Sequence, residues 1–369
     1  MAGGRVLPQE GRVLPQEGRV LLDEERVSLT DIQSSDVGEP EVSLEKRFFN
    51  LRTLASFAIA LAIIVYAVLR MDIDLGETMS YIARSNPLFF VLAIISFYLS
   101  FPVRALRWRL ILRNVGFTSE TVRVPSLAGL LEIILLSWFA NCIVPAKLGD
   151  AYRGYLLKRN AAVSFSTTMG TIVAERIFDM LVLFGLLAMA GWRMFRGHLP
   201  PAVVSILLAG VALVAVLAVV LLVLKVFSGV VERILPSRLG SFYSRFSEGT
   251  LLSFQNLPIL GVLTVAVWVL EAGRFWAVCQ SLGIHDVGIS VVFFIALASS
   301  LLTTLPITPA GLGVVETAVI AVLLLLGSLG VIRDIDTNLA TSVAILDRAI
   351  SHWSLIAVGL VLFVITKKK

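Results

Sequence analysis

Long apolar stretches dominate this chain from residue 53 onward, and most are long enough to cross a bilayer. They cover residues 53–69, 87–103, 127–144, 167–191, 201–224, 257–279, 289–305, 314–330 and 339–365. A helix needs roughly 17 to 25 such residues to span the hydrocarbon core. The chain is 57% hydrophobic and 15% charged, whereas soluble domains have about 25% charged residues. The sequence therefore predicts an all-α polytopic membrane protein.

The first 45 residues differ from the rest because they are polar and repetitive. The string GRVLPQE occurs at residues 4–10 and again at 11–17. Such a composition cannot bury enough apolar surface to fold. We expect residues 1–45 to be a disordered cytoplasmic tail without a cleavable signal peptide. Residues 46–369 then form the transmembrane domain, whose first apolar stretch acts as an uncleaved signal anchor.

Basic residues indicate the orientation of the segments, because cytoplasmic loops are rich in lysine and arginine. They flank residues 127–144 on both sides: Arg104, Arg107, Arg109, Arg113 and Arg123 before it, and Lys147, Arg153, Lys158 and Arg159 after it. We therefore interpret residues 127–159 as a re-entrant hairpin. Residues 289–330 form either a second hairpin, entered from outside, or two crossings. The sum is about six full crossings plus two broken or re-entrant helical hairpins, in the plasma membrane, with both termini cytoplasmic.

Three motifs recur in the same order at nearly one offset. A shift of 167 places Arg107 on Arg274, and a shift of 172 places Glu175-Arg176 on Asp347-Arg348. A shift of 164 aligns PAKLG at 145–149 with PAGLG at 309–313. These matches predict a duplication with halves at roughly 87–190 and 257–365. The halves are inverted if the first hairpin is re-entrant, and paired interruptions in such halves indicate a transport site near the membrane midplane.

Ionisable residues inside apolar segments are costly and usually functional. The alternative is that they are buried ion pairs joining helices. The PAKLG and PAGLG strings predict two helix breaks, which could bind a phosphate by another means. Helices starting after Gly149 and Gly313 would present unpaired N–H groups and the positive end of a helix dipole to it. The alternative there is a simple turn. The candidate substrate-binding residues are Asn141, Lys147, Gly149, Asp150, Arg153, Glu175, Arg176, Asp179, Arg274, Pro309, Gly311, Gly313, Glu316 and Arg348.

The motifs together resemble a known family. They are RALRW at 104–108, Asn141 with PAKLGDAYR at 145–153, AERIFD at 174–179, PITPAGLGVVE at 306–316, and Arg348. They are similar to the lysylphosphatidylglycerol synthase transmembrane-region family, also called flippase-like domain proteins. Asp150 departs mildly from the family, which often has Glu there, as does Ala310, where Gly is common.

The resemblance implies a membrane domain that moves lipids or lipid-linked groups between leaflets. In the synthases a soluble aminoacyltransferase domain follows, whereas this sequence stops at Lys369, so we expect the translocation part alone.

We interpret the chain as a lipid transporter, or flippase, for a lipid with an anionic, phosphate-bearing head group. We expect no enzyme activity, cofactor, metal or nucleic-acid partner, because no complete catalytic, nucleotide-binding or metal-ligating motif occurs. One alternative is a membrane-embedded transferase acting on a lipid carrier through Asp72 and Asp74. The other is a non-transporting partner of a membrane enzyme.

Overall fold

The computed structural model describes residues 51–118, 122–144, 148–194, 201–226, 236–303 and 308–366. Within these ranges every regular element is helical, so the predicted all-α class is confirmed. The predicted tail of residues 1–45 lies outside the described ranges, as does Lys147 among the candidate binding residues. The long apolar segments all form helices. Their ends lie within a few residues of those predicted, except that the helix starting at Pro87 continues well past residue 103.

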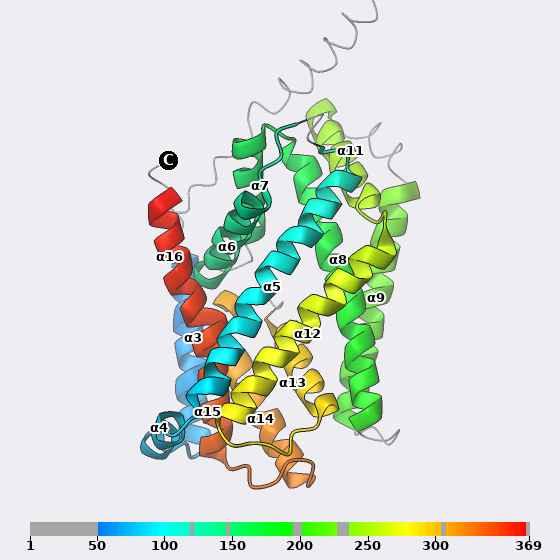
Figure 1. The fold of residues 1–369 in the computed structure, drawn as a ribbon. Coiled ribbons are helices and arrows are strands. Elements are labelled where there is room, and N and C mark those ends of the chain that lie inside the picture. The colour runs from blue at the N-terminus through cyan, green and yellow to red at the C-terminus, as the bar shows by residue number, and fades with distance from the viewer. Residues whose placement is uncertain are drawn as a thin grey trace, which may run out of the picture. The chain divides into compact units, whose positions relative to one another are not determined.

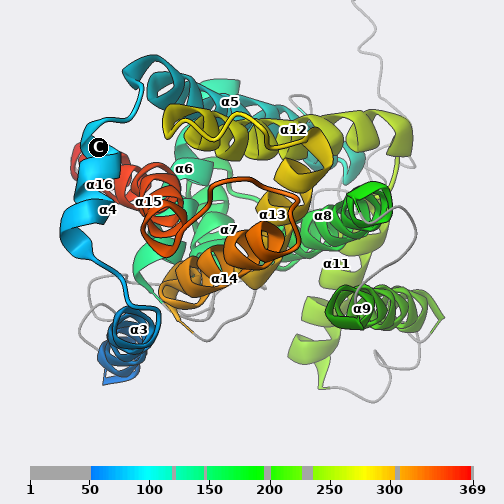
Figure 2. The ribbon, with the colours of Figure 1, turned by 90° about the horizontal axis from the view of Figure 1, so that it is seen from below.

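Two long helices pack against each other in the membrane domain, α5 (Pro87–Asn114) and α12 (Leu257–Ser281). They lie side by side in both views (Figures 1 and 2). The Asn86 N–H, just before α5, donates to the Ser281 carbonyl at 2.7 Å. At the other end, the Asn114 side-chain amide donates to the Gln255 carbonyl at 2.8 Å. The start of each helix thus meets the end of the other, and the pair is antiparallel.

Helix α5 corrects one prediction from the sequence. The apolar stretch ends at residue 103, but the helix continues to Asn114. Arg104 and Arg107, which we treated as flanking cytoplasmic charges, are 4% and 1% exposed. Burial of these arginines is possible because acidic residues of other helices pair with them. The two arginines therefore lie inside the helical domain and not in an exposed loop.

Both predicted breaks separate pairs of shorter helices. The first pair is α6 (Leu127–Ile143) and α7 (Leu148–Ala161). The second is α13 (Ile289–Leu302) and α14 (Val314–Ser328), with the 3₁₀ turn η1 (Pro309–Gly311) between them. Figure 1 places the first pair in the upper half of the view and the second pair in the lower half. We call them the first and second hairpins.

Helix α8 (Phe165–Met194) follows the first hairpin and carries most of its charged partners. It packs closely on α11 (Ser237–Leu252), a helix that the apolar pattern did not predict. A Cβ atom on Gly170 would lie 2.3 Å from the Phe246 carbonyl oxygen, and one on Gly249 would lie 2.4 Å from that of Thr167. These contacts leave no room for a side chain at either position. Helix α9 (Pro201–Val226) lies near the edge of the view in Figure 2.

The last apolar segment is one long helix built of three parts: α15 (Thr337–Arg348), the π-helical turn η2 (Ala349–Ser354) and α16 (Leu355–Thr366). At the start of the domain, α3 (Leu51–Arg70) is followed by a second element absent from the sequence prediction, α4 (Leu75–Ala83). The two are bent by 98° at the break between them.

Three helices of the described chain are long and apolar enough to cross a membrane: α5, α12 and the helix from Thr337 to Thr366. The bent pair α3–α4 counts as a fourth if it forms one span. Helix α8 has 30 residues but carries three charged side chains in its middle. The predicted total of about six crossings stays a prediction, as does the re-entrant course of each hairpin.

Candidate functional site

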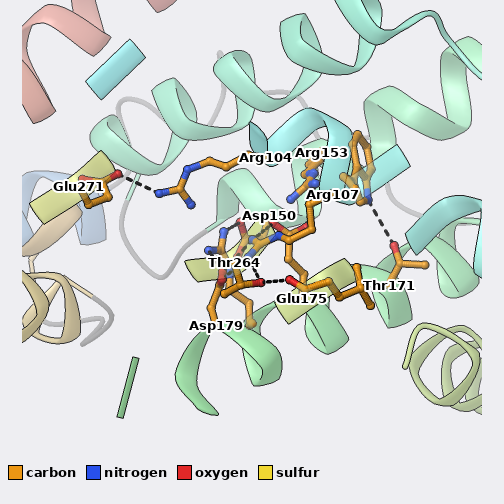
Figure 3. A network of polar contacts seen from close by, with 12 residues as sticks. Arg104, Arg107, Asp150, Arg153, Thr171, Glu175, Asp179, Thr264 and Glu271 are labelled. Carbon is orange, nitrogen blue, oxygen red and sulfur yellow. Dashed lines mark hydrogen bonds and ion pairs between the residues drawn. The ribbon is translucent and has the colours of Figure 1, made fainter. Parts of the chain in front are cut away.

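A network of buried charges joins α5, α7, α8 and α12 (Figure 3). Arg107 of α5 donates to Glu175 at 2.8 Å, to Asp179, and to the Thr264 hydroxyl at 2.9 Å. Glu175 and Asp179 lie one turn apart on α8, and each is 3% exposed. Residues four positions apart lie on the same face of a helix, so one arginine can bind both carboxylates. Their partner Arg107 comes from α5, 68 positions away from Glu175.

Arg153 of α7 lies on the far side of Glu175. Its guanidinium is 2.9 Å from the second Glu175 oxygen and stacks on the Trp108 ring at 3.8 Å. Trp108 donates in turn to the Thr171 hydroxyl at 3.5 Å. Arg153 is 2% exposed, so it joins the first hairpin to α8. Arg153, which we listed among the basic residues flanking the first hairpin, thus lies in this buried network.

The first break is held by side chains of both α6 and α8. Asp150, in the first turn of α7, accepts two hydrogen bonds from Arg176, at 2.8 and 3.1 Å. Asn141 accepts from the Gly149 N–H at 2.9 Å and donates to Asp150 at 3.3 Å. Gly149 is helical, and its N–H group is already bonded. Of the first-turn N–H groups expected to bind a phosphate, the one of Gly149 is therefore already used by Asn141.

The second break has a different construction. Gly313 has a φ of 83°, and its N–H donates to the Glu316 carboxylate at 2.6 Å. Arg348 donates to the other Glu316 oxygen at 2.6 Å and to the Ala310 carbonyl at 2.9 Å. Glu316 thus caps its own helix. The N–H of the N-cap Gly313 is thus also used within the protein, by the Glu316 carboxylate.

A third charged group lies between α12 and α15. Arg274 forms an ion pair with Asp347 and a longer contact with Glu271 at 3.4 Å. Glu271 accepts a shorter hydrogen bond, 2.8 Å, from Arg104 of α5. Glu271 and Arg274 are one turn apart on α12. The structure shows that the closest partner of each lies on another helix.

These groups surround a cavity of about 140 Å³ between the two hairpins. Of the candidate residues, the cavity wall includes Asn141, Arg176, Asp179, Arg274 and Arg348. Asp150 and Glu316 bind the two lining arginines Arg176 and Arg348. Arg153 and Glu175 lie behind Arg107 in the network, and Pro309, Gly311 and Gly313 belong to the backbone of the second break.

The sequence analysis missed several lining residues as candidates. Arg104, Trp138, Trp268, Glu271 and Thr308 all line the cavity. The shift of 167 that relates Arg107 to Arg274 also relates Arg104 to Glu271, and this was a usable signal. The aromatic residues and Thr308 carry no comparable pattern, because isolated tryptophan and threonine residues are common in membrane helices.

The acidic pair considered for a transferase lies at the turn between α3 and α4. Asp74 is the N-cap of α4 and accepts from the Gly76 and Glu77 N–H groups at 2.7 and 3.1 Å. This is the usual structural role of an N-cap aspartate. In the part of the chain that the structure describes, no group of three or more His, Cys, Asp or Glu side chains could hold a metal ion.

Residues 54–359 match the family model described as lysylphosphatidylglycerol synthase TM region. The match covers most of the chain, so the protein belongs to this family. Its relatives include a UPF0104 membrane protein of Methanocaldococcus jannaschii, which is 33% identical over 62% of this chain and 95% of its own length. A second UPF0104 membrane protein, from Methanothermobacter thermautotrophicus, is 21% identical over 82% of this chain and 92% of its own length.

A third relative is named for an activity. The glycosyltransferase AglD of Haloferax volcanii is 24% identical over 79% of this chain, but over only 51% of its own length. The chain therefore corresponds to about half of that protein.

Proposed function

We propose that this protein moves a phosphate-bearing lipid, or a lipid-linked group, between the two leaflets of a membrane. The observation that carries the proposal is the cavity between the hairpins, with charged side chains on its wall. Two arginines on this wall, Arg176 and Arg348, each bind a carboxylate in the first turn of a hairpin helix. Charged groups inside an apolar helical domain are costly and usually functional, and here they can receive a lipid head group away from the hydrocarbon core.

The pattern of ion pairs supports an inverted repeat, in which each half supplies one hairpin to this cavity. Arg107 of α5 binds Glu175 of α8, and its counterpart Arg274 of α12 binds Asp347 of α15. The next residue of each acidic helix, Arg176 or Arg348, binds the acid that follows a break. The equivalent helices α5 and α12 are antiparallel. Inverted repeats of this kind surround the substrate site of many transporters.

The three charged groups together carry balanced charges, and this balance affects how a head group binds. It contains equal numbers of arginines and carboxylates, namely Arg104, Arg107, Arg153, Arg176, Arg274 and Arg348 with Asp150, Glu175, Asp179, Glu271, Glu316 and Asp347. An anionic head group must therefore compete with these carboxylates for arginine donors. Such binding is reversible, as transport requires, because release restores the internal pairs.

The transferase alternative rests on Asp72 and Asp74, and the name of the Haloferax relative is compatible with it. Asp74 has a structural role as the N-cap of α4. This role favours transport over transfer chemistry at the acidic pair.

Transport can be measured in proteoliposomes that contain a trace of fluorescent phosphatidylglycerol. Dithionite added outside quenches only the outer leaflet, unless the protein exchanges lipid between leaflets. We expect nearly complete quenching with the wild-type protein and much slower quenching with Arg176→Ala and Arg348→Ala. Asp74→Asn serves as the control, because the transferase alternative needs that carboxylate and the transport account does not. Outer-leaflet quenching alone with the wild-type protein would contradict the proposal.

A further inference from the structure

Three residues on the cavity wall carry buried side-chain donors to which no described residue bonds. They are the Arg104 Nε, the Trp268 Nε1 and the Thr308 hydroxyl, and none has a hydrogen-bond partner in the described part of the chain. Their residues are 4%, 6% and 3% exposed, respectively. A buried polar group without a partner is rare in proteins and needs a specific explanation. All three line one cavity, so one ligand can explain them.

The donors come from separate parts of the fold. Arg104 is on α5 and Trp268 on α12, the two antiparallel helices, whereas Thr308 immediately precedes η1 of the second hairpin. An indole N–H and a guanidinium N–H only donate, and a hydroxyl donates or accepts. The group that satisfies all three must therefore be an acceptor. Phosphate oxygens are such acceptors, and they form stronger hydrogen bonds than neutral oxygens do.

Arg104 is the best placed of the arginines on the wall to hold an anion. Arg176 and Arg348 each make two hydrogen bonds to their own hairpin, whereas Arg104 makes one bond, from Nη2 to Glu271. Its guanidinium lies 4.5 Å from the centre of the Trp138 ring, which fixes its plane. Figure 3 shows Arg104 reaching toward Glu271, apart from the Arg107 network.

We infer that Arg104, Trp268 and Thr308 form an oxyanion site that binds the phosphate of the transported lipid. This inference rests on the proposed function and assigns its head-group contacts. It also changes the roles of the predicted residues, because Arg176 and Arg348 then position the hairpins. The other buried side-chain atoms without a hydrogen bond among the described residues belong to Arg107, Arg153 and Glu175 of the buried network and to His352. Of these, the Arg153 Nη2 and Glu175 Oε2 atoms form an ion pair with each other. None of these four residues lines the cavity.

The test is the rise in melting temperature of the detergent-solubilised protein on addition of three probes. A ligand that binds only the folded state raises this temperature in a concentration-dependent way. The probes are dioctanoyl-phosphatidylglycerol, dioctanoylglycerol, which has the same chains without phosphate, and inorganic phosphate. We expect stabilisation by phosphatidylglycerol and none by dioctanoylglycerol.

The variants remove one donor each with little change of shape: Arg104→Lys, Trp268→Phe and Thr308→Val. Each should weaken the apparent affinity for phosphatidylglycerol by about tenfold, the usual effect of losing one hydrogen bond to a charged group. Trp276→Phe is the matched control, because Trp276 is on the same helix and packs on Phe89 outside the cavity. It should bind as the wild type does.

The outcomes separate the two proposals. Equal affinity in the wild type and all three cavity variants would overturn the oxyanion site and leave lipid transport standing. Failure of phosphatidylglycerol to stabilise even the wild type would contradict the proposed function. Stabilisation by inorganic phosphate alone, lost in the three variants, would support the oxyanion site and exclude the lipid as its occupant.

Discussion

The two hairpins share the string Pro-Ala-x-Leu-Gly but stabilise their breaks in different ways. At the first break, Gly149 is helical and lies against the backbone of α6, where an added Cβ would be 2.1 Å from the Ser137 carbonyl oxygen. At the second, Gly313 and Ala310 have φ angles of 83° and 48°. The first glycine is therefore required by packing and the second by backbone conformation. A sequence motif can thus recur while the physical reason for each residue changes.

The charged partners of the hairpins differ too. Two residues of α7, Asp150 and Arg153, pair with α8, and Arg153 is also stacked on Trp108. Among the described residues of the second hairpin, one ion pair joins it to the last helix, between Glu316 and Arg348. The first hairpin is thus joined to its helix by one more buried ion pair. We expect it to be the more rigid of the two.

The largest expected effect is the loss of Glu175. Glu175→Ala leaves Arg153 buried without a carboxylate, and breaking a buried pair in this way costs about 3–5 kcal/mol. Its counterpart Asp347→Ala should cost less, because Arg274 keeps Glu271 at 3.4 Å. Thermal unfolding in detergent gives the comparison, with the exposed Asp286→Ala as the control. Equal losses at Glu175 and Asp347 would remove the distinction between the hairpins.

Gly149→Ala tests the packing requirement at the first break. The new methyl group would overlap the backbone of α6, which cannot rotate away, so we expect a loss of about 1–3 kcal/mol. Gly185→Ala is the matched control, since this glycine is also helical and has no atom within 4 Å of an added Cβ. That change should be neutral or slightly stabilising. Similar unfolding temperatures for both variants would show that α6 and α7 are not in close contact.

Gly313→Ala tests the conformational requirement at the second break. The left-handed conformation should cost about 1–2 kcal/mol for alanine. Gly116→Ala provides the cost of conformation alone, because Gly116 has a φ of 86° and open space around it. Gly313 also lies near α3, with an added Cβ 2.9 Å from the Ala60 carbonyl oxygen. We expect the greater loss at Gly313, and a smaller loss there than at Gly116 would contradict this description of the break.

Ala310→Gly is the smallest of the four effects and has the opposite sign. Glycine removes about 1–2 kcal/mol of strain from the left-handed conformation of the folded state. Its greater freedom in the unfolded state lowers the free energy of unfolding by roughly 0.5–1 kcal/mol. A net gain of about 0.5–1 kcal/mol should appear as a higher melting temperature. The control Ala321→Gly, inside α14, should lower it. Destabilisation by both changes would mean that Ala310 is unstrained.

The sequence predicted the parts of the site that depend on local spacing. The breaks, the acidic face of α8 and the buried arginine of the last helix were all found from apolar stretches and their interruptions. Partners distant in the sequence were not found. Arg104 was assigned to a loop because its helix becomes polar after residue 103, although Glu271 compensates it from α12. Likewise, the capping of Gly149 by Asn141 depends on the angle between two helices.

The most direct test of the central claim is an experimental density map of the protein in nanodiscs that contain phosphatidylglycerol. The account predicts a compact phosphate density inside the cavity, within hydrogen-bonding distance of Arg104, Trp268 and Thr308, with acyl chains leading out toward the bilayer. It further predicts that both hairpins contact this head group. Phosphate density confined to the outer surface of the helices, with an unoccupied cavity between the hairpins at saturating lipid, would contradict it.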